Sequence, residues 1–442
     1  MASMNTKVAK TPIYTHEGAK ASHISVQAEL ERTLNACFLW EDTFYEDGQS
    51  VAQRLHDLTA KLPAKTVSEM AIKARTVHNL RHAPLWLIVG MIKANYSDKN
   101  DRALISYTIQ QVVNRPDELG ELVSLYRMTG KHPLTKQMKL GLGAAFKKFN
   151  EYSLAKYAGD SKAYSPRDVM FLVHPKPDND AQKELWAKVA NKTLSTPDTW
   201  ETQLSAGKDK GETFTRLIQE SKLGVLAFIR NLRNMNESGV SRSLVEQYSQ
   251  TVNLEKALPF RFITAARHVP AWSDIIENMM LRSTKEMEKL KGKTLILVDN
   301  SASMYGTKVS SKSELDRASA AQALSILVRE ICEESVIISY STSNAIIPAH
   351  VRGFSLGEAI SKATSHGGTD TGGAVAYANS LGYDRIIVFT DEQTATRVPN
   401  PLTKKAYMIN VATYQNGVGY GAWTHINGFS EATVKYIQAV EA

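Results

Sequence analysis

Cysteine is nearly absent from this chain, with only Cys37 and Cys332 among 442 residues. The two thiols lie far apart, have none of the paired spacing of a zinc site, and cannot build the disulfide framework of a small secreted protein. Such low cysteine usage is typical of a reducing compartment. We therefore predict a cytoplasmic protein.

Long apolar runs are also missing. The opening MASMNTKVAKTPIYTHEG contains no apolar stretch that would serve as a secretory signal. The longest apolar run, PLWLIVGMI at 84–92, is about half as long as a membrane-spanning helix must be. We expect no membrane partner. With 43% hydrophobic and 22% charged residues, the composition is that of an ordinary globular protein, and the length suffices for two or three domains.

The net charge of +8 is unevenly distributed. From Lys291 onward the chain holds 13 basic and 13 acidic side chains, so the whole excess falls on residues 1–290. This division is expected when one domain meets an anionic partner and the other does not. A solvated basic face would give an excess of the same size, so charge alone decides nothing.

Residues 1–290 have little strand-like alternation. Apolar residues recur at helical spacing in VQAELERTLNACFLW, VAQRLHDLTAKL, VSEMAIKARTVHNL and DRALISYTIQQVV. Prolines at positions 63, 84, 116, 133, 166, 197 and 259 fall between such segments or in their first turns. Pairs of helices of this length predict an all-α domain that resembles HEAT-type helical repeats.

The pattern changes after Lys291. KTLILVDNS, SVIISYST, DRIIVFTDE and KAYMINVAT are short β-branched runs, and helical patterns separate them. Strands that alternate with helices predict a parallel, doubly wound α/β domain over residues 291–442. In that architecture the loops at the carboxyl ends of the strands form the site.

Carboxylates and hydroxyls follow the predicted strands. Asp299, Ser301 and Ser303 leave the first strand, Thr369 lies in the glycine-rich SHGGTDTGGA, and Asp391 ends a later strand. Hard oxygen ligands with few formal charges suit a Mg²⁺ ion, or another divalent cation, that keeps some of its water. The sequence therefore predicts a divalent metal site, with an open position for a carboxylate of a partner.

Other interpretations of the same residues have less support. A phosphate-binding loop would need G-x-x-x-x-G-K-[ST], which is absent. A serine nucleophile would need a G-x-S-x-G elbow and a histidine partner. A phospho-aspartyl mechanism at Asp299 lacks the second aspartate two residues on, and a plain capping turn would explain only the first of the three segments.

The D-x-S-x-S pattern with a later threonine and aspartate resembles the metal-ion-dependent adhesion site of von Willebrand factor A domains, over about 293–442. This resemblance implies that the serines and the threonine contact the ion directly or nearly so, while the aspartates often act through water. Asn300 departs from the pattern, because a small or apolar residue is commoner there.

Several segments before residue 290 are similar to the TROVE domain of the Ro family, the RNA-binding Ro autoantigen and its bacterial orthologues. They are THEGAKA, FLWEDTFYEDG, ARTVHNLRHAPLWL, LGAAFKKFNEYSLAKY, YSPRDVMFLVHPKP and VLAFIRNLRNMNESG. The resemblance implies a ring of HEAT-like repeats whose basic central hole takes single-stranded 3′ ends of misfolded structured RNAs. It also implies an outer surface that binds Y RNAs, which are small non-coding RNAs.

Basic and aromatic residues cluster four times along this part of the chain. Basic groups beside exposed aromatics follow a phosphate backbone and stack on bases, but each cluster taken alone also fits a solvated or inter-helix face. The candidate RNA-contacting residues are Lys147, Lys148, Lys156, Tyr157, Arg167, His174, Arg75, Arg81, Arg230, Asn231, Arg261 and Arg267.

We thus expect a monomeric, non-catalytic RNA-binding protein, since one ion in a hydroxyl-rich cage is not a two-metal nuclease. Two other functions stay open. One is a protein-interaction scaffold whose metal site grips an acidic partner residue, and the other is a Mg²⁺-dependent phosphotransfer enzyme. The sequence does not identify the RNAs, nor does it show whether an exoribonuclease is recruited.

Overall fold

A computed structural model describes most of the chain. The described residues are 12–15, 18–21, 24–35, 48–78, 80–130, 132–159, 163–254, 257, 259–285, 287–309, 315–412, 417–419, 421–428 and 432–441. Cys37, the end of the first predicted helix and most of the FLWEDTFYEDG segment lie outside these residues.

The part of the chain before residue 290 is helical in all the described elements of regular structure, as predicted. Its helices are α1 (Val26–Asn35), α2 (Gly48–Ala60), α3 (Ala64–Thr76), α4 (His82–Lys93), α5 (Lys99–Val112), α6 (Pro116–Met128), α7 (Lys136–Phe146), α8 (Glu151–Lys156), α9 (Pro166–Val173), α10 (Asp180–Asn191), α11 (Trp200–Ser205), α12 (Lys210–Gln219), α13 (Val225–Glu237), α14 (Arg242–Thr251), α15 (Pro259–His268), the 3₁₀ turn η1 (Pro270–Trp272) and α16 (Ser273–Lys285).

The boundaries of these helices follow from local chemistry. The side chains of Asp98, Thr135 and Ser165 accept hydrogen bonds from backbone N–H groups in the first turns of α5, α7 and α9. Pro116 and Pro166 occupy the first helical position of α6 and α9, where no N–H donor is needed. The helices are therefore short and sharply delimited, as stacked helical pairs require.

Six strands form one sheet: β1 (Leu290–Asp299), β2 (Cys332–Tyr340), β3 (Asn344–Ile346), β4 (Arg385–Thr390), β5 (Ala406–Asn410) and β6 (Thr424–Asn427). Their order is β3-β2-β1-β4-β5-β6, and every pairing is parallel except that of β2 with β3. The remaining elements are η2 (Ala302–Met304), α17 (Arg317–Ile331), α18 (Gly353–Ala363), α19 (Thr371–Leu381) and α20 (Ala432–Glu441).

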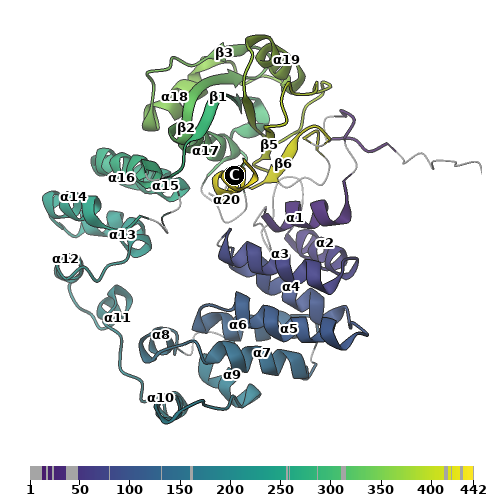
Figure 1. Ribbon diagram of the computed structural model, residues 1–442. Helices are drawn as coiled ribbons and strands as arrows, with labels where there is room; N and C mark the ends of the chain where they lie inside the picture. The colour runs from purple at the N-terminus through teal and green to yellow at the C-terminus, as the bar shows by residue number, and fades with distance from the viewer. Residues whose placement is uncertain are drawn as a thin grey trace, which may run out of the picture.

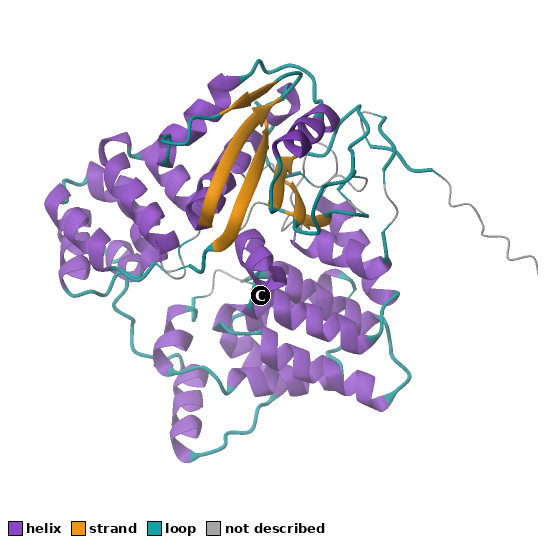
Figure 2. Ribbon diagram, turned by 45° about the horizontal axis from the view of Figure 1, so that its top comes forward, coloured by secondary structure: helices purple, strands orange, loops and turns teal. Residues whose placement is uncertain are grey.

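The sheet is buried on both faces, which confirms the predicted doubly wound α/β architecture. Leu295 and Leu297 of β1 belong to the core that includes α19. Ile296 and Val298, which point to the opposite face, belong to the core that includes α17. Figure 2 shows the helices on the two sides of the sheet. None of the helices in the described part is both long and apolar enough to cross a membrane.

The helices follow one another around a ring, and the α/β domain stands between the two ends of the arc (Figure 1). The segment before α1 packs on the α/β domain, because Ala19 is buried in the core that contains Leu295. The Thr15 hydroxyl donates a hydrogen bond of 3.2 Å to the carbonyl oxygen of Thr394. The beginning of the chain is thereby held against the domain that ends it.

The boundary between the two large hydrophobic cores does not coincide with the point at which helices give way to strands. One core runs from Leu30 to Val189, through α1 to α10. Another begins at Phe214 and continues through α12 to α16 into α17 and the sheet. The strands begin at Leu290, beside the predicted domain boundary, but the helices just before them share a core with the α/β domain.

Candidate functional site

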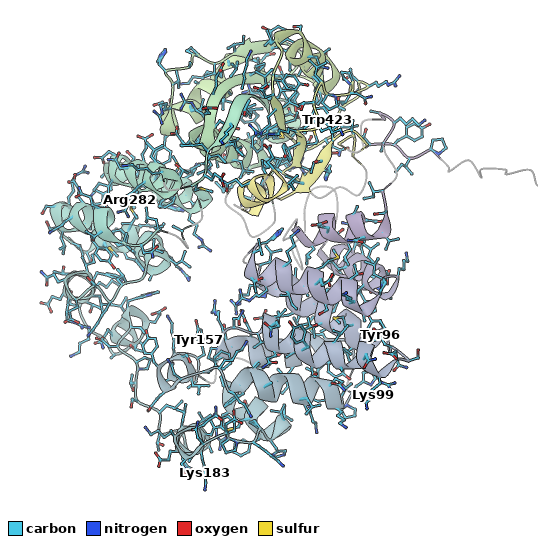
Figure 3. The ribbon with its side chains drawn as sticks, viewed as in Figure 1. Tyr96, Lys99, Tyr157, Lys183, Arg282 and Trp423 are labelled. Carbon is cyan, nitrogen blue, oxygen red and sulfur yellow. The ribbon has the colours of Figure 1, made fainter. Side chains whose placement is uncertain are left out.

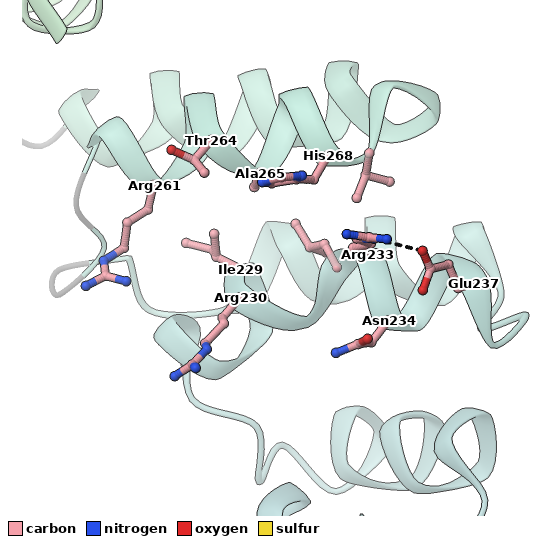
Figure 4. A pocket seen from close by; sticks show the side chains of 11 residues that line it. Ile229, Arg230, Arg233, Asn234, Glu237, Arg261, Thr264, Ala265 and His268 are labelled. Atoms are coloured by element: carbon pink, nitrogen blue, oxygen red, sulfur yellow. Dashed lines mark hydrogen bonds and ion pairs between the residues drawn. The ribbon is translucent and has the colours of Figure 1, made fainter. Parts of the chain in front are cut away.

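A basic pocket of about 560 Å³, here called the inner pocket, lies between α13 and α15 (Figure 4). These two helices lie on the inner side of the ring, with α14 and α16 outside them (Figure 1). The pocket is lined by Ile229, Arg230, Leu232, Arg233, Asn234, Glu237, Arg261, Thr264, Ala265, His268 and Val269. Apolar walls and converging basic groups are thus combined in one concave surface.

The inner pocket carries an excess of positive charge. Arg230 is exposed and makes no hydrogen bond or ion pair within the described part of the chain. Arg233 forms an ion pair with Glu237 at 2.8 Å, one helical turn further on. Arg261 reaches the same pocket from α15, so two of the predicted arginines meet here although 31 positions of sequence separate them.

Two predicted neighbours of these arginines lie elsewhere. Asn231 is only 1% exposed, and its Nδ2 donates to the carbonyl oxygen of Ala227 at 2.9 Å within α13. Arg267 donates to the hydroxyl of Ser319 on α17 and so links the helical arc to the α/β domain. The structure places both in intramolecular contacts, and their predicted role in RNA contact stays a prediction.

A second pocket, the lysine pocket, has a volume of about 620 Å³ and lies between α7 and the end of α9. Lys136, Lys139 and Lys176 are exposed there and make no ion pair within the described residues. Lys147 also lines the pocket, but it is paired with Asp178. His174 ends α9 in the left-handed conformation, with φ of 48°, and is one of the residues that line the pocket.

A third pocket, the Lys156 pocket, has about 440 Å³ and combines Lys156, Arg167 and Lys192. Lys156 is exposed at the end of α8. Arg167 already makes two contacts within the protein. Its Nε donates to the carbonyl oxygen of Ala190 at 2.8 Å, and its guanidinium carbon lies 4.9 Å from the centre of the Phe171 ring.

Two other predicted residues of this region, Tyr157 and Lys148, make contacts with neighbouring side chains and backbone of the protein. Tyr157 lies on the inward side of the ring (Figure 3), where the guanidinium carbon of Arg115 sits 5.0 Å from its ring centre. The ammonium group of Lys148 donates to Asn114 Oδ1 at 3.0 Å and to the carbonyl oxygen of Gln110.

Arg75 and Arg81 belong to a network of ion pairs between helices. Arg75 Nη2 lies 2.7 Å from Oε1 of Glu118, which is fully buried. Arg81 Nη2 lies 2.7 Å from Asp117 and 3.0 Å from Glu121. Their charges are compensated by these carboxylates, and their predicted role in RNA contact stays a prediction.

Further residues reach the three pockets without having been predicted from the sequence. They are Lys136, Lys139, Lys176, Lys192 and His268. The signal for the first two is present in TKQMK, because their spacing of three places them on one helical face. The others are brought in only by the packing of neighbouring helices.

The acidic and hydroxyl residues of the α/β domain gather at one edge of the sheet. Asp299 ends β1 and Asp391 follows the adjacent strand β4. Asp299 Oδ1 accepts a hydrogen bond of 2.9 Å from the Ser301 N–H, and the hydroxyls of Ser301 and Ser303 are 3.3 Å apart. The Thr394 hydroxyl donates to the carbonyl oxygen of Thr369 at 3.1 Å, which joins the glycine-rich loop to the loop after β4.

This edge presents carboxylate and hydroxyl oxygens, the atom types that the predicted divalent ion would need. Burial and the nearby charge of Asp391 raise the pKa of Asp299 to about 7. The buried hydroxyl of Ser341, just after β2, has no hydrogen-bond partner in the described chain. The described residues contain no group of three or more histidine, cysteine, aspartate or glutamate side chains placed to hold a metal ion.

Part of this sequence is similar to a known domain family and to two known proteins. A TROVE domain is matched at residues 190–326, which include the inner pocket and the loop after β1. Telomerase protein component 1 from Rattus norvegicus is 28% identical over 116 residues, and that from Mus musculus is 29% identical over 113 residues. These matches cover 22% and 21% of this chain but only 4% of each relative, so the chain spans a small part of the length of these relatives.

A solved structure matches nearly the whole chain. The crystal structure of the Deinococcus radiodurans RO (RSR) protein superposes with a TM-score of 0.63 at 17% sequence identity. The match covers 94% of this chain and 99% of that one. The arrangement of a helical arc with an α/β domain is therefore shared over nearly the full length of both chains.

Proposed function

We propose that this chain, which matches a TROVE domain at residues 190–326 and shares the fold of a Ro protein, is a non-catalytic RNA-binding protein of the Ro type. In this proposal it acts as a cytoplasmic monomer in RNA quality control. Single-stranded 3′ ends of misfolded RNAs bind at the inner pocket. Small non-coding, Y-like RNA binds at the lysine pocket and the Lys156 pocket.

The observation that carries the proposal is the composition of the inner pocket. Arg230 offers a guanidinium group with no acidic partner in the described chain, and Arg261 lines the same concave surface. A guanidinium group binds phosphate oxygens in pairs, and the apolar wall formed by Ile229 and Ala265 suits the face of a base. A pocket of about 560 Å³ between two helices is also of the size that small ligands occupy.

The two other pockets support contact with a phosphate backbone. Their exposed lysines are point charges that fix a backbone without reading its bases. Binding through such groups releases counterions and therefore weakens steeply as salt is added. We expect little sequence preference at these pockets and a strong response to ionic strength.

The proposal includes a Mg²⁺ ion at the edge of the sheet. Ser301, Ser303 and Thr369 would hold it, with Asp299 and Asp391 acting directly or through water. When bound, the ion would supply a positive centre that accepts a carboxylate from a partner. We assign it no catalytic step, because a hydroxyl-rich cage of this kind holds one ion, whereas two-metal hydrolysis needs a pair of ions.

The test is equilibrium filter binding with a structured RNA that carries a single-stranded 3′ tail and the same RNA with a blunt end. Arg230→Gln with Arg261→Gln should weaken binding of the tailed RNA at least about tenfold and leave the blunt RNA nearly unchanged. A matched control is Arg242→Gln, since Arg242 is exposed on α14 and already paired with Asp274.

Loss of both RNAs to the same degree in the double variant would contradict the assignment of the tail to the inner pocket. Absence of RNA binding in the unaltered protein, or an affinity that does not change with salt, would contradict the RNA function itself. The protein-interaction scaffold would then be the better explanation of the metal site and the helical arc.

A further inference from the structure

A buried arginine adjoins the edge of the sheet where the carboxylates meet. Arg317 is the first residue of α17, and only 2% of it is exposed. Its Nη1 lies 3.0 Å from Oδ2 of Asp391 and donates a second hydrogen bond, of 3.2 Å, to the carbonyl oxygen of Ser303. The same guanidinium thus contacts two of the residues proposed to hold the ion.

The position of this arginine is electrostatically unusual. The N-terminus of a helix carries partial positive charge and favours anions, so a buried cation there needs strong compensation. Asp391 supplies it with one carboxylate oxygen, while the other oxygen accepts the Gln393 N–H at 3.1 Å. Both oxygens of Asp299 also accept hydrogen bonds, from Ser301 N–H and from the Thr390 hydroxyl.

The charges at this edge follow from these contacts. Two carboxylates provide at most two negative charges, and Arg317 cancels one of them before any ion arrives. A divalent ion would then have to approach a fixed positive charge in a low-dielectric environment, where repulsion between like charges is strong. The ion would also compete with the guanidinium for Asp391.

We propose that Arg317 is a built-in counterion that holds Asp391 and keeps the affinity of the site for divalent ions low, so that the ion exchanges readily. This inference rests on the proposed ion site. With the ion bound, the two carboxylates and the guanidinium leave a net charge of about +1 at the site. Arg317 therefore also favours an anionic group at the open position of the ion.

The experiment is isothermal titration of the full chain with Mg²⁺, and with Mn²⁺ followed by electron paramagnetic resonance. Arg317→Met should bind both ions at least about tenfold more tightly than the unaltered protein, because a nearby positive charge is gone. Arg317→Lys, which keeps the charge, should stay within about threefold of the unaltered protein. Arg317→Gln gives the neutral comparison if the methionine variant does not fold.

A matched control is Arg385→Met. Arg385 is as deeply buried, but it begins β4 and pairs with Glu441 at the opposite end of that strand from Asp391. This variant should lose stability without a change in ion affinity. Equal or weaker ion binding in Arg317→Met and Arg317→Gln, or the same gain in Arg385→Met, would overturn the counterion role. If neither the unaltered protein nor any variant binds Mg²⁺ or Mn²⁺, it is the ion site itself that fails.

Discussion

Replacing the three uncompensated cations of the lysine pocket provides a quantitative test of RNA binding there. The triple variant Lys136→Gln, Lys139→Gln and Lys176→Gln removes charges that have no acidic partner within the described residues. All three side chains are exposed, so the fold should tolerate the change. We expect weaker binding of small structured RNA and a flatter dependence on salt.

The magnitude follows from the number of free charges. Each neutralised phosphate contributes about 0.9 to the slope of log affinity against log salt for a duplex, and about 0.7 for a single strand. Loss of three contacts should therefore lower the slope by roughly 2 to 3. Between about 50 and about 200 mM salt, the difference in affinity between the two proteins should shrink roughly 20-fold or more.

Filter binding over this salt range, with one small structured RNA, measures both slopes. The matched control replaces Lys291, Lys362 and Lys404 of the α/β domain by glutamine, which changes the net charge equally. Lys147→Gln is a second control, since pairing with Asp178 already offsets this charge and its removal should lower the slope by less than one free lysine does. Equal slopes for the triple variant and the unaltered protein, or the same fall in the α/β control, would refute the assignment.

Three further results are expected. Arg75→Met leaves the fully buried carboxylate of Glu118 without its partner at 2.7 Å, and should lower the free energy of unfolding by about 3 kcal/mol or more in urea denaturation. A loss below about 1 kcal/mol would mean that the charge of Arg75 is dispensable for stability. Charge reversal in Lys156→Glu with Arg167→Glu should weaken small structured RNA about tenfold or more in filter binding, and unaltered affinity would place the site elsewhere. Ser301→Ala with Thr369→Ala should abolish the calorimetric signal of Mg²⁺ while RNA affinity stays within about twofold, and a parallel loss of RNA binding would show that the two sites are coupled.

The fold of the α/β domain, and the proximity of Asp299 to Asp391 within it, could be predicted because both residues lie at the carboxyl ends of strands. Asp299 and Asp391 are separated by 92 positions, yet each follows an apolar β-branched run. Parallel strands place their carboxyl ends at one edge, so the sequence alone brings such residues together. Arg317 could not be predicted in this way, because it lies at the start of helix α17 and not at the end of a strand, and only its long side chain brings its charge to Asp391.

The helical part was harder because the sequence does not show where a long basic side chain finds its partner. Arg75 and Arg230 both lie in amphipathic helices rich in basic residues. Arg75 meets Glu118, a carboxylate 43 positions away on another helix, whereas Arg230 meets none in the described chain. Only the stacking of the helices separates a structural arginine from one available to a ligand.

The two cores give the proposed RNA sites a physical basis for acting separately. The lysine pocket and the Lys156 pocket lie mainly on helices of the core that ends at Val189. The inner pocket belongs to the core that begins at Phe214 and continues into the sheet. Changes at distant sites without shared partners are nearly additive. A double variant can combine a substitution in the inner pocket with one in the lysine pocket. For each RNA, its change in binding free energy should then equal the sum of the changes measured for the two single variants.

Strong non-additivity would indicate that one RNA occupies both halves of the ring at once.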